Sequence, residues 1–352
     1  MSEKNWLVEL SPILKEYSIE PYFIESFGRI LKIYSSKGVF ALKTIDPHHG
    51  TDFIRYVQAL YQKGYNRIVP IFPTADGRYA VLHDKNLYYL MPWLSNEIKE
   101  DRLERHKQLF RELARLHTLS AKEMNISKED RKEHYENTQL VLDKDKEFLE
   151  GYIEECERTE YTSPFELLFC LYFQDISQAL NFSEKKLKEW YDQTKDHEKV
   201  RTVIIHGKLS TEHFLFDDRG YGYFINFEES KVGSPIHDLL LFLSRSLKGY
   251  PMQNEESVEL MSLYFKYFPF KEEEMLLFQS YFAHPGVLIK YLNRYHQTGR
   301  KKNERKHVQQ LQRQFWQFKN IEYVVMRIDE IEKQKQQAAQ AQAAQQEGAQ
   351  SE

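Results

Sequence analysis

The N-terminal part of the chain carries short runs in which apolar and β-branched side chains alternate with polar ones, a pattern typical of β-strands. These runs predict five strands, over residues 30–34, 39–44, 68–72, 79–82 and 87–91. Two stretches with helical spacing of apolar residues accompany them, over residues 7–17 and 52–62. We therefore expect a small antiparallel sheet with few helices at this end of the chain.

Helical spacing dominates the rest of the chain. Apolar stripes predict helices over residues 109–119, 164–182, 239–247, 255–268, 272–282 and 308–328. The charged stretch 121–148 predicts a solvated helix or a mobile insertion, and the Gln/Ala-rich residues 333–352 predict a frayed helix or a disordered tail. We therefore expect an α+β protein with a five-stranded lobe at 1–93, a mainly helical lobe at 94–332 and a hinge at 92–97.

The central stretch, residues 203–238, breaks this helical pattern. It predicts three short strands, at 203–205, 214–216 and 221–225. A polar loop separates the first two strands, and a turn at 217–220 that ends in Gly separates the last two. This order of strand, loop, strand, turn and strand resembles the layout of a phosphotransferase catalytic centre.

The same stretch resembles the core of the aminoglycoside phosphotransferase and choline kinase group, which has a bilobal protein-kinase-like fold. That group carries His-Gly-Asp, then four residues and Asn, and later an Asp that ends a strand. The resemblance implies that the first Asp is the catalytic base and that the Asn and second Asp hold magnesium on ATP phosphates. This chain keeps His206 and Gly207 but has Lys208, His213 and Asn226 at the three functional positions.

These three substitutions argue against conventional catalysis. An ammonium such as that of Lys208 cannot accept a proton from an attacking hydroxyl. Magnesium prefers hard oxygen ligands, and Asn226 and Glu228 offer only a weak pair beside the softer nitrogen of His213. We therefore expect no metal site, a degenerate catalytic centre and a salt bridge from Lys208 to Glu228.

The nucleotide positions of the resembling group are incomplete here. Lys43 stands where that group has a strand lysine that reaches the nucleotide phosphates, but Gly28 is the single glycine of the expected phosphate loop. Asp52 is the nearest acid for Lys43 on the helix at 52–62, and it fits a helix N-terminal charge. Asp238 matches a retained Asp that supports the catalytic loop, so we expect a structural role. We expect no cofactor under this interpretation.

Within the wider group, the chain is most similar to the spore-coat kinase-like proteins of the CotS, YutH and YsxE set, above all the YsxE type. The segment 282–292, with an aromatic residue before Ala-His-Pro, carries this resemblance. It implies a pseudokinase that is made in the mother-cell cytoplasm, joins the spore coat and has other coat proteins as partners. The alternative is a divergent ATP-dependent phosphotransferase acting on a small hydroxylated molecule or a sugar polymer.

Composition excludes several other classes. The 352 residues carry a formal net charge of −4, which does not suggest a nucleic-acid partner. The two cysteines, Cys156 and Cys170, lack metal-type spacing, and no apolar run approaches the length of a membrane span.

The 23 Tyr and 23 Phe indicate a large aromatic core or an adhesive surface. The basic run 299–307 fits a solvated face or a binding patch.

Overall fold

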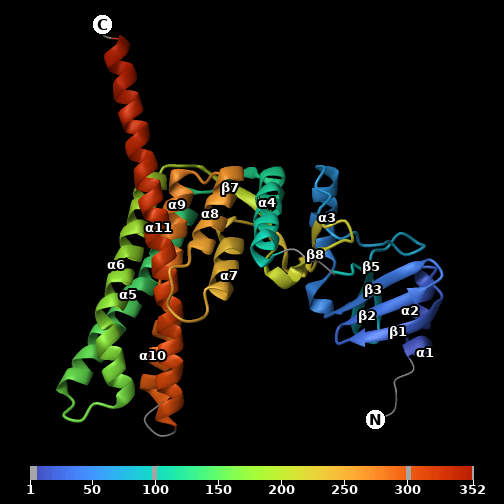
Figure 1. Cartoon of the computed structure of the whole chain (residues 1–352), viewed down its shortest axis with the longest axis horizontal. Helices are drawn as coiled ribbons and strands as arrows, with labels where there is room; N and C mark the ends of the chain where they lie inside the picture. The colour runs from blue at the N-terminus through green and yellow to red at the C-terminus, as the bar shows by residue number, and fades with distance from the viewer. Residues whose placement is uncertain (1–5, 97–100, 299–302, 351–352) are drawn as a thin grey trace. The chain divides into compact units, whose positions relative to one another are not determined.

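The computed structural model describes residues 6–96, 101–298 and 303–350. The chain forms two compact units, one of residues 1–122 with 202–238 and the other of 123–201 with 239–352 (Figure 1). Residue 97 of the expected hinge and residues 299–302 of the basic run lie outside the described residues. The lobe boundary expected at 92–97 stays a prediction.

A five-stranded antiparallel sheet forms the centre of the first unit, with the strand order β1-β2-β3-β5-β4. Its strands are β1 Pro21–Phe27, β2 Ile30–Ser35, β3 Gly38–Ile45, β4 Val81–His83 and β5 Asn86–Pro92. Residues Ile33 and Leu42 of this sheet are fully buried in one core with residues of the helix α2, Ser11–Glu16. The mixed α+β fold class expected from the sequence is confirmed.

One of the five expected strands is wrong, and another was missed. Residues 68–72 make only two isolated bridges, Ile68 to Phe224 and Phe72 to Leu90. Pro70 lies in the middle of this segment and has no N–H to donate to a ladder. The missed strand is β1, which lies at the sheet edge and exposes side chains without regular alternation. Its sequence therefore lacks the period of a half-buried strand.

The helices of the first unit follow the apolar spacing closely. They are α1 Trp6–Glu9, α2 Ser11–Glu16, α3 Asp52–Gln62 and α4 Arg102–Ser120. The single helix expected at 7–17 is two short helices, because Pro12 stands at the start of α2, where its missing N–H is tolerated. The helix α3 has the expected bounds and buries Phe53, Val57 and Leu60.

The central stretch, residues 203–238, contains three short strands and the end of a fourth. They are β7 Lys199–Ile205, β8 Phe214–Phe216, β9 Gly222–Phe224 and β10 Lys231–Gly233. The last residues of β7 pair with β10, and β8 pairs with β9. Asp217 closes the turn between β8 and β9 by accepting the backbone N–H groups of Arg219 and Tyr221 at 3.0 and 2.9 Å. The expected strand, loop, strand and turn order is thus present.

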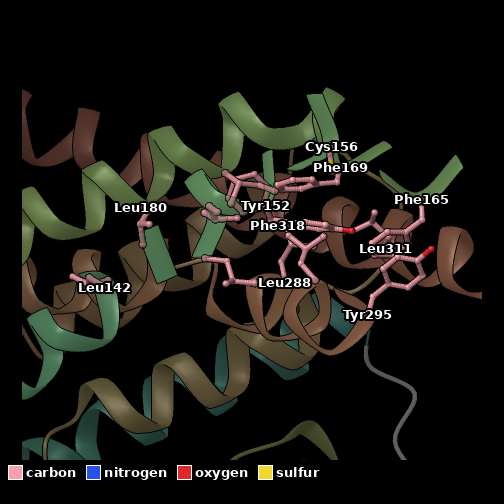
Figure 2. Packing of buried hydrophobic residues seen from close by; sticks show 14 of the residues in the cluster. Leu142, Tyr152, Cys156, Phe165, Phe169, Leu180, Leu288, Tyr295, Leu311 and Phe318 are labelled. Atoms are coloured by element: carbon pink, nitrogen blue, oxygen red, sulfur yellow. The ribbon is translucent and has the colours of Figure 1, made fainter. Parts of the chain in front are cut away.

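The second unit is mainly helical. Its elements are β6 Lys122–Asn125, α5 Lys128–Arg158, α6 Pro164–Thr194, α7 Ile236–Ser246, α8 Glu255–Tyr267, α9 Glu272–Ala283, α10 Gly286–Thr298 and α11 Glu304–Gln350. The strand β6 and the helix α7 begin in the first unit and continue in the second. Figure 2 shows the main core, where Tyr152 stacks on Phe169 with ring centroids 4.7 Å apart. Leu142 and Leu149 of α5 belong to this core, so the charged stretch at 121–148 packs as a helix with one buried edge.

The helix α11 runs through the Gln/Ala-rich tail and extends beyond the other helices of its unit (Figure 1). Residues 333–338 on it are exposed. The described tail is therefore a continuation of a packed helix. Within the described ranges, every helix is too short or too polar to cross a lipid bilayer.

Candidate functional site

The structure brings Lys43 and Asn226 together in the first unit, although 183 residues separate them. Lys43 lies on β3, and Asn226 precedes the short 3-10 helix η3, Phe227–Glu229. The Lys43 ammonium donates to Asn226 Oδ1 at 2.5 Å and also to Glu228 Oε1. The Lys43 and Glu228 side chains are 12% and 8% exposed. Asn226 and Glu228, the two weak candidates for metal ligands, thus both bind the buried ammonium of Lys43.

Tyr89 completes this cluster and was missed by the sequence analysis. It lies opposite Lys43 in the pairing of β3 with β5, and its hydroxyl donates to Glu228 Oε1 at 2.5 Å. The tyrosine is 2% exposed. The alternating pattern of β5 places Tyr89 on a buried face, but only the register between strands shows which residue it meets.

Burial and pairing set the charges of this cluster together. Burial lowers the pKa of Lys43, while the Glu228 carboxylate opposes that shift. For Glu228, burial alone would raise the pKa, but the Lys43 ammonium and the Tyr89 hydroxyl outweigh it and hold the pKa below its usual value. Glu228 therefore remains a carboxylate, which keeps a buried ion pair with Lys43.

Asn226 adopts a left-handed backbone conformation, with φ 66° and ψ 54°. Asparagine tolerates this region better than most residues. The conformation ends the segment that follows β9 and starts η3, which carries Glu228. The backbone thus presents Asn226 and Glu228 to the same ammonium.

His206 is fully buried and is hydrogen-bonded to the loop at 207–213. Its Nε2–H donates to the Ile225 carbonyl at 2.7 Å, and its Nδ1 accepts the Lys208 backbone N–H at 3.2 Å. These roles require the neutral ring with the proton on Nε2. Burial lowers the pKa of His206, which is consistent with this neutral form. His206 therefore ties the loop to the end of β9.

His213 stacks beside His206, with ring centroids 5.7 Å apart. It lies in the 3-10 helix η2, Thr211–His213, and its Nδ1–H donates to the Lys208 carbonyl at 2.7 Å. Burial lowers its pKa to about 4. The ring is therefore neutral at neutral pH, and its Nε2 is the nitrogen that could act as an acceptor.

Lys208 is exposed at the loop tip, at the position of the expected base. Its backbone is held from both sides by His206 and His213. The carboxylate of Glu228, expected as its partner, is paired with Lys43 and Tyr89. Lys208 thus contributes an exposed positive charge to a site that already holds the Lys43 ammonium.

Asp238 is fully buried and holds the start of the loop at 207–213 through hydrogen bonds to its backbone. Its two oxygens accept the backbone N–H groups of His206 at 2.7 Å and Gly207 at 2.9 Å, and His117 Nε2 lies 3.3 Å away. Burial alone would raise the pKa of Asp238, but the hydrogen bond from His117 and the charges around it lower that pKa. Asp238 thus accepts two backbone hydrogen bonds from this loop, and its structural role stays a prediction.

Gly207 and Gly28 both have positive φ, for different reasons. At Gly207, φ is 76° and a Cβ would lie 2.2 Å from the Glu229 carbonyl oxygen, so a side chain cannot fit. At Gly28, φ is 71° in the tight turn between β1 and β2, where a Cβ would meet nothing. Turn geometry alone therefore accounts for Gly28.

Asp52 is 79% exposed at the start of α3 and pairs with Arg55, as a helix-end charge does.

The site does not fit a magnesium ion held on nucleotide phosphates. Asn226 and Glu228 both accept hydrogen bonds from the Lys43 ammonium through their side-chain oxygens, and the third position is the imidazole of His213. Among the described residues, no group of three or more His, Cys, Asp or Glu side chains is placed to hold a metal. The arrangement presents two ammonium groups and neutral histidines, without a carboxylate at the position of the base.

Both the sequence and the fold of the chain are similar to those of known phosphotransferases. The model of the phosphotransferase enzyme family matches residues 22–259, which is more than half of the chain. An aminoglycoside phosphotransferase from Alicyclobacillus acidocaldarius is similar in structure, with a TM-score of 0.65 and 14% identity over 90% of this chain and 95% of that one. The comparison with curated proteins found no match.

A second similar structure is spectinomycin phosphotransferase APH(9)-Ia, solved in complex with ADP and spectinomycin. Its TM-score is 0.52, with 14% identity over 92% of this chain and 98% of that one. Identity this low shows a shared fold and leaves the activity of this chain open. The function of this chain therefore depends on the residues of its own site.

Proposed function

The chain belongs to the phosphotransferase enzyme family, and we propose that it acts as a non-catalytic member, an interaction module of the spore coat. The observation that carries this proposal is the engagement of Asn226 and Glu228 by the ammonium of Lys43. The resemblance implies that the position of Asn226 holds magnesium and that the position of Lys43 reaches the phosphates. Here Asn226 and Glu228 both accept hydrogen bonds from Lys43, so each side chain has a partner from the chain itself.

The electrostatics of the site also support a non-catalytic role. Magnesium in such sites is bound through carboxylates and phosphate oxygens. Moving it onto Glu228 would displace a buried ammonium and leave that charge without a partner, which is costly. The carboxylate expected as the catalytic base is absent as well, because Lys208 stands at its position.

An exposed aromatic edge supports the interaction role. The edge strand β1 exposes Tyr22, Phe23 and Phe27 by 67%, 51% and 56%. An unpaired edge with large apolar side chains is a template for a partner chain, which can add a strand and fill the space between the rings. The partner proposed here is another coat protein, which the resemblance to spore-coat kinase-like proteins suggests.

Thermal denaturation with nucleotide tests the non-catalytic part. With ATP in large excess, we expect no rise in melting temperature and no added effect of magnesium. A ligand at a hundred times its dissociation constant stabilises the folded state by ~2.7 kcal/mol, which such an experiment resolves. The triple variant Lys208→Asp, His213→Asn and Asn226→Asp should gain magnesium dependence. A magnesium-dependent rise in the unmodified protein, lost in Lys43→Ala, would overturn the proposal.

Affinity capture from sporulating cells tests the interaction part. The unmodified protein should recover coat proteins, and a Phe23→Ser and Phe27→Ser double variant should lose them. Leu171→Ser and Val287→Ser, which change exposed apolar residues of the second unit, form the matched control. Recovery of the same proteins by the β1 variant would refute a role of this edge.

The second candidate is a divergent ATP-dependent phosphotransferase, favoured by the retained Lys43, Glu228 and Asp238 and by the family match. It predicts transfer of the γ-phosphate to a hydroxylated acceptor. The non-catalytic candidate predicts neither a thermal shift with ATP nor phosphate transfer, whereas the divergent enzyme predicts both. A thermal shift without phosphate transfer would indicate nucleotide binding alone.

A further inference from the structure

We propose that a cleft in the second unit, between the α7–α8 connection and α11, binds an acidic saccharide. The cleft has a volume of about 520 Å³, within the range of small-molecule sites. All of its described lining belongs to the second unit, so it is distinct from the site around Lys43. The proposal is independent of whether the protein is catalytic.

An aromatic pair provides the first recognition element. Tyr250 of the connection packs against Trp316 of α11, with ring centroids 4.5 Å apart and planes at 38°. Tyr250 is 73% exposed, so much of the pair faces solvent. Exposed aromatic surface of this size next to a cleft is typical of a binding site, and the C–H face of a pyranose ring packs well against it.

Positive charge provides the second element. Lys248 and Arg313 both line the cleft and are exposed. In the described lining there is no Asp or Glu to neutralise them. A ligand with a carboxylate would therefore be attracted, and the Arg313 guanidinium can bind that carboxylate in a bidentate manner.

Amide groups provide the third element. Gln310, Gln314 and Gln317 line the cleft and are spaced by four and three residues along α11, which places them on one face. Gln317 Nε2 donates to the Ser244 carbonyl at 2.7 Å, which fixes the orientation of that amide. Each amide has a donor beside an acceptor, a combination that matches hydroxyl groups, which donate and accept.

A buried asparagine holds the cleft in shape. Asn320 is 2% exposed, and its Nδ2 donates to the Leu247 and Tyr250 carbonyls at 3.1 Å each. Its Oδ1 accepts the Met252 backbone N–H at 2.9 Å. The connection that carries Lys248 and Tyr250 is therefore fixed to α11, which reduces the entropy lost on binding.

These elements together select the ligand class. The aromatic pair favours a ring with an apolar face, the amides favour several hydroxyl groups, and the cations favour an acid. A neutral sugar leaves the two cations unused, and an aromatic acid leaves the amides unpaired. A sugar ring bearing a carboxylate satisfies all three.

Calorimetric titration with trigalacturonate tests the proposal, with tryptophan fluorescence as a second readout. The uncharged methyl ester of the same trisaccharide is the charge control, and benzoate is the non-sugar control. We expect trigalacturonate to bind at least tenfold more tightly than either control. Arg313→Gln should weaken binding about tenfold. Arg305→Gln, an equal charge change on an exposed residue of the same helix, should leave binding within twofold.

A Trp316→Phe variant keeps the ring and should bind with a small loss, while Trp316→Ala should lose most of the affinity. Circular dichroism of each variant confirms that the helices are retained. Equal binding of the ester or of benzoate would overturn the ligand class. Absence of binding, or binding unchanged in both Arg313→Gln and Trp316→Ala, would overturn the site.

Discussion

The hydroxyl of Tyr89 donates to the Glu228 carboxylate at 2.5 Å, across 139 residues of sequence. Glu228 thereby has two partners, one a neutral hydroxyl and the other the Lys43 ammonium. This pairing gives a buried carboxylate both a hydrogen bond and a counter-charge. It also gives the site several measurable properties.

Replacing Tyr89 by Phe should lower the free energy of unfolding by ~1–3 kcal/mol, because it removes a buried hydrogen bond to a charged acceptor without creating a large cavity. Urea denaturation followed by circular dichroism measures the change. Tyr161→Phe is the matched control, since Tyr161 is 86% exposed. Equal stability of the two variants would show that the Tyr89 hydroxyl contributes nothing.

Lys43 and Glu228 should be strongly coupled. Lys43→Met leaves the Glu228 carboxylate buried without its cation, which typically costs ~3–5 kcal/mol. Adding Glu228→Gln should restore part of this stability, because the second change removes the unpaired charge. A double-mutant cycle from chemical denaturation measures the coupling energy. Additive effects of the two substitutions would contradict the ion pair.

Asp238→Ala should destabilise the protein by ~3 kcal/mol, because it leaves the buried N–H groups of His206 and Gly207 without an acceptor. Lys208→Ala changes an exposed side chain on the same loop and should stay within ~0.5 kcal/mol. Thermal melts of both variants provide the measurement. Similar melting temperatures would argue against the loop support described for Asp238.

Stability should fall as the pH is lowered from neutral. The pKa of His213 is about 4 in the folded protein, and that of buried His206 is also lowered. In the unfolded chain both titrate near ~6.5, so between these values the unfolded state binds protons that the folded state does not. Their contribution is therefore complete above ~6.5 and is lost on acidification.

The test of this pH dependence is a series of urea midpoints from neutral pH down to mildly acidic pH. His213→Gln should show a shallower decrease than the unmodified protein, because one of the two groups no longer titrates. His48→Gln, a change at a histidine whose side chain is 69% exposed, is the control. Parallel curves for all three proteins would rule out His213 as a contributor.

Removing residues 337–352 should leave the melting temperature unchanged. The described side chains of this segment are exposed, while the deletion keeps Lys333, which pairs with the buried Asp329 at 2.6 Å. The helical circular dichroism signal should decrease in proportion to the residues lost. A clear drop in melting temperature would show that the tail packs against the body.

Local patterns in the sequence determined much of the fold. The helix α3, the strands β8 and β9 and the buried face of α6 follow from apolar spacing and turn residues, which act over a few neighbours. The strand predicted from such local patterns at 68–72 was wrong, because a proline in this segment interrupts strand pairing. These patterns also missed β1, because an exposed edge strand needs no alternation.

The resemblance to the aminoglycoside phosphotransferase and choline kinase group placed Lys43, His206, Asn226 and Asp238 in one candidate site. Only the tertiary structure decided which of these residues meet. The partners of Glu228 depend on the register of β3 against β5 and on the left-handed backbone at Asn226. The same holds for the cleft beside Trp316, whose shape depends on the hydrogen bonds of Asn320 to a distant loop. Such contacts join residues far apart in the chain, so no local periodicity encodes them.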